Sequence, residues 1–87
     1  MHETGLVRDL IRRIDQAAAA NGAARVSGVR VWLGALSHLS AAHFREHFEI
    51  ESRGSAAQGA SLTITESADP ADPDAQHLRL ETLDLEV

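Results

Sequence analysis

The sequence predicts an α+β fold in which two helices pack on one face of a small three-stranded mixed sheet, in the order helix, strand, helix, strand, strand. Apolar residues recur at helical spacing in two segments and alternate at strand spacing in three others. A helix between the first two strands allows a right-handed parallel crossover. The chain has 87 residues, enough for one small domain with a thin core, so residues 1–87 are expected to form a single unit.

The first helix is expected over residues 4–21. Asn21-Gly22 ends it, because Asn and Gly adopt the left-handed C-cap conformation at low cost. The apolar stripe of this helix consists of Leu6, Val7, Leu10, Ile11, Ile14, Ala17 and Ala18.

The first strand is indicated by Val29, Val31 and Leu33, which alternate with Arg30 and Trp32, and it closes at Gly34. Val26 is out of phase with this set. A bulge near Ser27-Gly28 would bring both parts onto the core side.

The second helix is expected over residues 41–52, with Ser40 as its N-cap and Phe44 and Phe48 on its buried line. Alternating apolar residues over 60–64 indicate the second strand.

An acidic loop follows at residues 66–76, since its two prolines forbid a helix or a central strand. The last strand is expected over 78–87, with a bulge or bend where the apolar phase shifts between Leu80 and Leu83. The loop permits antiparallel pairing between the last two strands.

Composition excludes several classes of function. The net charge of −5 argues against non-specific nucleic-acid binding, which needs a basic face. The absence of cysteine excludes a disulfide framework, a Cys-ligated zinc site and a Cys nucleophile within this sequence. No long apolar run or secretory signal is found, so the expected location is cytoplasmic, with no membrane span.

The amino terminus is a candidate metal site. Methionine is normally removed only before a small residue, so Met1 is expected to remain ahead of His2 with a free α-amine. That amine, the His2 backbone nitrogen and the His2 imidazole can close two fused chelate rings on one ion. Glu3 offers its backbone nitrogen or its carboxylate as a fourth donor. A planar set of nitrogens suits Ni(II) or Cu(II).

A second constellation, His43-Phe44-Arg45-Glu46-His47, fits the H-x-x-E-H string of inverted zinc peptidases. Two histidines four apart on a helix can also share a secondary metal ion. A catalytic zinc needs a third protein ligand and a walled cleft, for which this chain leaves little room. His43 and His47 are therefore interpreted first as surface or half-buried residues. His38 and His77 are interpreted as isolated surface residues, unless folding brings one of them near the amino terminus.

The order of these segments resembles the nickel-incorporation proteins of the HypA/HybF family along residues 1–65 and again along 78–87. The most specific parts are the Met-His-Glu start and the Gly-x-Leu-Ser segment after the first strand. The matching segments are Met1-His2-Glu3, Leu6-Val7, Leu10-Ile11, Gly22-Ala23-Ala24-Arg25-Val26, Val29-Arg30-Val31, Gly34-Ala35-Leu36-Ser37, Phe44, Phe48, Arg53-Gly54-Ser55, Gly59-Ala60, Leu62-Thr63-Ile64 and Leu83-Asp84-Leu85-Glu86-Val87.

The resemblance implies a metallochaperone rather than an enzyme. It implies Ni(II) held by Met1, His2 and Glu3, with His2 as the essential ligand. It also implies delivery of nickel to the [NiFe]-hydrogenase large subunit, and in some organisms to urease, together with the GTPase HypB.

The sequence departs from the family where the family inserts a zinc domain held by two Cys-x-x-Cys pairs. Residues 66–76 occupy that place here, so no structural zinc is expected. Loss of the insertion would open a strand edge that allows strand-mediated or swapped homodimers. The alternative function is a metal-free, truncated paralogue that acts as a protein-interaction module in hydrogenase assembly.

Overall fold

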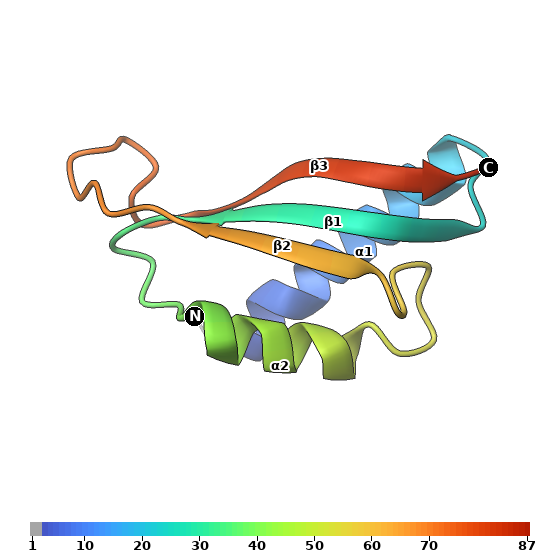
Figure 1. Cartoon of the computed structure of the whole chain (residues 1–87), viewed down its shortest axis with the longest axis horizontal. Coiled ribbons are helices and arrows are strands. Elements are labelled where there is room, and N and C mark those ends of the chain that lie inside the picture. The colour runs from blue at the N-terminus through green and yellow to red at the C-terminus, as the bar shows by residue number, and fades with distance from the viewer. Residues whose placement is uncertain (1–2) are drawn as a thin grey trace.

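The computed structural model describes residues 3–87 and contains two helices and three strands (Figure 1). The elements are α1 (Glu3–Ala20), β1 (Arg25–Leu33), α2 (Ala41–Glu51), β2 (Ser61–Glu66) and β3 (Leu78–Glu86). The predicted fold class and element order are confirmed. Neither described helix is long and apolar enough to cross a membrane.

The sheet has the strand order β2-β1-β3, with β1 parallel to β2 and antiparallel to β3. Pairing between the last two strands, which the sequence permitted, does not occur. The connection from β2 instead passes the end of β1, where the backbone N–H of Gly34 donates to the carbonyl of His77 at 2.9 Å and that of Leu36 to Ala75 at 2.7 Å. These bonds place the start of β3 beside the free edge of β1.

Two irregularities keep apolar side chains on one face of the sheet. The β1–β3 register jumps from Val26 to Gly28, which confirms the predicted bulge. A second shift skips Glu81 in β3 and so falls between Leu80 and Leu83, as the change of apolar phase indicated. Without these shifts, part of each strand would turn its apolar residues to solvent.

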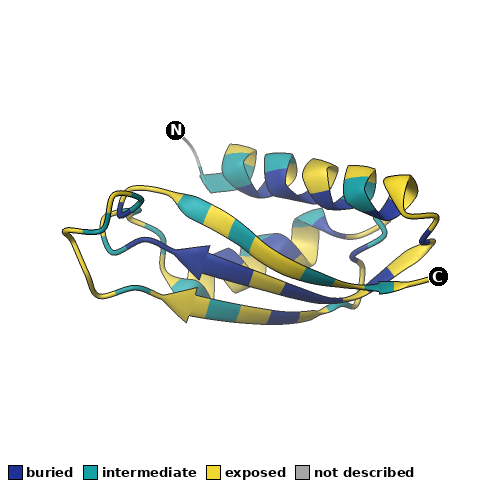
Figure 2. Cartoon of the chain, turned by 90° about the horizontal axis from the view of Figure 1, so that it is seen from above, coloured by how far each residue is buried: buried dark blue, intermediate teal, exposed yellow. Residues whose placement is uncertain are grey.

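The core lies between the helices and one face of the sheet, and Figure 2 shows the buried residues concentrated in β1 and on the helix sides that face it. The largest fully buried side chains are Phe44, Leu10, Ile14, Leu33, Val7, Val29 and Val31. Trp32 lies outside this cluster and is covered by Arg79, whose guanidinium carbon is 3.9 Å from the ring centroid. Trp32 is thus a packing residue.

Asp15 connects α1 to the turn between α2 and β2. Its Oδ1 accepts a hydrogen bond from the backbone N–H of Ala56 at 2.9 Å, and the Ala56 carbonyl accepts one from Val26 at 2.9 Å. We expect Asp15→Ala to lower the free energy of unfolding by about 1–2 kcal/mol, because a half-buried N–H loses its charged acceptor. Urea denaturation followed by circular dichroism measures this change.

Asp9→Ala is the matched control on the same helix. Asp9 pairs with Arg12 and Arg13 on the exposed side of α1. Exposed pairs of this kind contribute little, so the control should stay within about 0.5 kcal/mol of the parent protein. Equal losses in the two variants would show that the contact with Ala56 does not stabilise the turn.

Candidate metal site where α1 meets α2

The predicted metal-binding tripeptide is described from its third residue, since Met1 and His2 lie outside the described residues. Glu3 opens α1 and precedes Val7, Leu10 and Ile14 at spacings that place all four on one face of the helix. Its carboxylate therefore extends the buried stripe. Glu3 Oε1 is buried and has no hydrogen-bond partner among residues 3–87.

His47 of α2 is the neighbour of this carboxylate. Phe44 and Phe48 stack with ring centroids 6.2 Å apart and bury one face of α2. Because Phe48 faces the core, His47, the residue before it, lies on the side of α2 that meets α1. His47 Nε2 lies 3.6 Å from Glu3 Oε2, and His47 Nδ1 lies 3.3 Å from Thr4 Oγ1. The His47 side chain is 37% exposed and that of Glu3 is 23% exposed, so solvent still reaches the pair.

A second contact between the helices lies one turn further along. Arg8 Nε donates to Glu51 Oε2 at 2.9 Å. This hydrogen bond and the carboxylate charge raise the pKa of the Arg8 guanidinium above its ordinary value. Because Thr4 meets His47 and Arg8 meets Glu51, the two helices run in the same direction here, and the first turns of α1 are held against the middle and end of α2.

The other two metal-binding residue types of the H-x-x-E-H string, His43 and Glu46, lie at the surface. His43 and Glu46 are exposed, and the backbone N–H of His43 donates to the side chain of Ser40 at 3.2 Å, which confirms Ser40 as the N-cap. Within residues 3–87, no group of three or more His, Asp or Glu side chains is arranged to hold a metal ion. The structure thus offers no support for a peptidase centre, and a shared metal on His43 and His47 remains a prediction.

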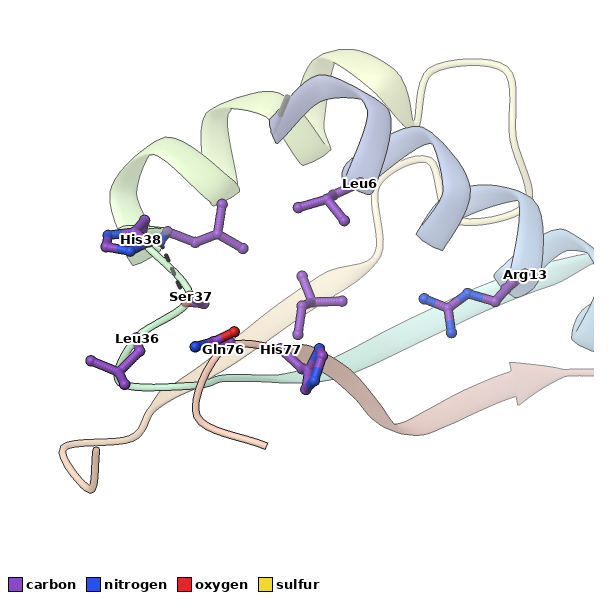
Figure 3. Close-up of a pocket in the computed structure, with 9 residues that line it drawn as sticks. Leu6, Arg13, Leu36, Ser37, His38, Gln76 and His77 are labelled. Atoms are coloured by element: carbon purple, nitrogen blue, oxygen red, sulfur yellow. Dashed lines mark hydrogen bonds between the residues drawn. The ribbon is translucent and has the colours of Figure 1, made fainter. Parts of the chain in front are cut away.

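A cavity of about 610 Å³ lies beside Leu6, near the start of α1 (Figure 3). His38 and His77 both line it, from the segments that precede α2 and β3. Both histidines are exposed, and His38 has a backbone φ of 61°. Their shared cavity arises because the chain passes the end of β1 before entering β3. No local signal in the sequence links them.

Sequence reasoning missed the contact between Glu3 and His47. Part of the signal was present, because Glu3 stands four residues before Val7 on the buried stripe and His47 stands beside Phe48. The hydrophobic pattern of the sequence does not give the relative placement of the two helices, because that placement depends on how both helices pack on the sheet.

The chain has the fold of solved HypA structures. The solution structure of the Ni metallochaperone HypA from Helicobacter pylori matches with a TM-score of 0.83 at 21% identity, covering 98% of this chain and 97% of that one. A second solution structure of a HypA protein matches with a TM-score of 0.77 at 21% identity, covering 99% and 97%.

The model of the HypA family, described as hydrogenase/urease nickel incorporation, metallochaperone, matches residues 1–72, and the chain belongs to this family. It is 39% identical over 64 residues to hydrogenase maturation factor HypA of Rhodobacter capsulatus, covering 74% of this chain and 57% of the relative. It is 41% identical over 64 residues to HybF of Salmonella typhimurium, with the same coverage. The chain thus spans little more than half the length of these relatives. The family's role is metal incorporation.

Proposed function

We propose that this chain is a nickel metallochaperone domain that binds Ni(II) at Met1, His2 and Glu3 and serves the maturation of [NiFe]-hydrogenase or urease. The Met1 amine, the His2 backbone nitrogen and imidazole, and a donor from Glu3 form the ligand set. A HypB-like GTPase and the hydrogenase large subunit are the proposed partners. Relatives of this family are named hydrogenase maturation factors, which supports this direction of metal transfer.

The position of Glu3 at the start of α1 is the observation that carries the proposal. The first N–H groups of a helix have no acceptor within the helix, so the Glu3 backbone nitrogen is not committed to the fold. The chain can therefore give this nitrogen to a metal without breaking a helical hydrogen bond. Amine, imidazole and amide nitrogens together suit Ni(II).

Calorimetric titration of Ni(II) into protein with a native Met1 amino terminus tests the proposal. The parent protein is expected to bind one ion, and His2→Ala is expected to weaken binding at least about 100-fold, because it removes the imidazole and opens a chelate ring. One additional residue ahead of Met1 should have a comparable effect, since it displaces the amine from the chelate.

Glu86→Gln, at the far end of β3, is the control and should bind nickel like the parent. If the His2→Ala and extended proteins bind nickel as tightly as the parent, the amino-terminal site is wrong. If the parent itself binds no nickel but is still retained by a HypB-like GTPase, the metal-free interaction module replaces the chaperone proposal.

A further inference from the structure

We propose that His47 of α2 is a ligand of the nickel ion held by the amino terminus, and that it binds through Nε2 together with the Glu3 carboxylate. The inference rests on the proposed function, because the amino terminus supplies the remaining donors. It gives the metal a second role, since an ion bound to both Glu3 and His47 would join the first turn of α1 to α2.

The separation of the two side chains fits a shared ion. Bonds from imidazole nitrogen or carboxylate oxygen to a divalent first-row metal are about 2.0–2.2 Å long, so two donors of one ion lie no more than about 4.2 Å apart. His47 Nε2 and Glu3 Oε2 are 3.6 Å apart, which is longer than a good hydrogen bond and inside this limit. One ion can contact both atoms without movement of either helix.

Thr4 orients the ring for this role. Its hydroxyl oxygen lies 3.3 Å from His47 Nδ1, close enough to accept a hydrogen bond from it, and the tautomer with the proton on Nδ1 would leave the Nε2 lone pair free on the side of Glu3. Histidines that bind metals commonly donate their other ring nitrogen to an oxygen in this way, which fixes the tautomer and the direction of the lone pair. Thr4 is therefore a positioning residue.

The Glu3 carboxylate supplies an independent observation. Its Oε1 is buried without a hydrogen-bond partner among the described residues, whereas its Oε2 faces His47. A buried polar atom without a partner costs free energy, and such atoms are rare in folded proteins. A cation that contacts both oxygens of this carboxylate would compensate that cost, whereas a His47–Glu3 ion pair through Oε2 alone leaves it in place.

The coordination number follows from the donors. Amine, imidazole and backbone nitrogens would supply a planar set of donors, and the Glu3 carboxylate and the His47 ring would add donors beyond that set. The bound ion should then be five- or six-coordinate and paramagnetic. Removal of His47 should shift it toward a four-coordinate planar, diamagnetic state, which absorption and proton NMR spectra distinguish.

The experiment compares the parent protein with His47→Ala, both with a native Met1 terminus, by Ni(II) calorimetry, visible absorption and NMR. We expect His47→Ala to weaken nickel binding at least about 10-fold, since even loss of an outer-shell partner of a metal costs 10–100-fold. In the parent, nickel should also perturb the His47 ring resonances. Circular dichroism of the metal-free proteins checks that the substitution leaves the fold intact.

Four further variants separate the explanations. Glu49→Ala, an exposed change on the same helix, should leave affinity and spectra unchanged. Thr4→Val should weaken binding less than His47→Ala, and Thr4→Ser should restore it. If His43→Ala weakens binding as much as His47→Ala while His2→Ala has no effect, the ion lies on the α2 histidine pair and the proposal is overturned.

Failure of the inference and failure of the proposed function give different results. If His2→Ala abolishes binding but His47→Ala keeps the affinity and spectrum of the parent, the amino-terminal site stands and His47 is only an ion-pair partner of Glu3. If the parent binds no nickel, both are wrong.

Discussion

Phe44→Ala should lower the free energy of unfolding by about 3–5 kcal/mol, the range found when a buried phenylalanine is truncated. Phe44 is fully buried and stacks on Phe48, and together they attach α2 to the core. For a domain of this size the loss corresponds to a fall of at least about 12 °C in melting temperature. Calorimetry or thermal circular dichroism measures it.

Phe44→Leu is the matched variant, because it keeps an apolar side chain of similar length and leaves a smaller cavity. Its loss should be less than half that of Phe44→Ala. Since Phe44 and Phe48 determine which side of α2 faces the core, Phe44→Ala should also disturb the position of His47 relative to Glu3. Equal stability of the alanine and parent proteins would mean that α2 is not anchored by this ring.

Gly34→Ala should lower the free energy of unfolding by about 2–4 kcal/mol, from overpacking and from the loss of neighbouring hydrogen bonds. A Cβ at Gly34 would meet the Ala75 carbonyl oxygen and lie 2.7 Å from the Asp74 carbonyl oxygen. These are backbone atoms that cannot rotate away, so the acidic loop of residues 66–76 must move. Its movement would strain the bond from Gly34 N–H to the His77 carbonyl.

Gly5→Ala is the opposite control. Gly5 lies in α1 with nothing within 4 Å of an added Cβ. The same chemical change should raise the free energy of unfolding by about 0.5–1 kcal/mol, because alanine is the better helix former. Chemical denaturation of both variants measures the difference. A neutral result for Gly34→Ala would show that the connection between β2 and β3 does not pack tightly against the end of β1.

Much of the fold could be predicted because it is encoded locally. The stripe in α1, the N-cap at Ser40 and the bulge after Val26 each follow from the spacing of a few neighbouring residues. The partner of β3 could not be predicted in this way. The loop length allowed either neighbour, and hydrogen bonds at Gly34 and Leu36 select the free edge of β1.

The sequence by itself determined the class of the elements, the family and the residue types present at the amino terminus, because periodicity and residue chemistry are properties of the chain alone. Only the tertiary structure decided that His47 lies 3.6 Å from Glu3 and that His38 and His77 share a cavity. These pairs are distant in the sequence. Their proximity comes from packing two helices on one sheet face and from passing the chain around the end of β1, and neither leaves a periodic mark on the residues involved.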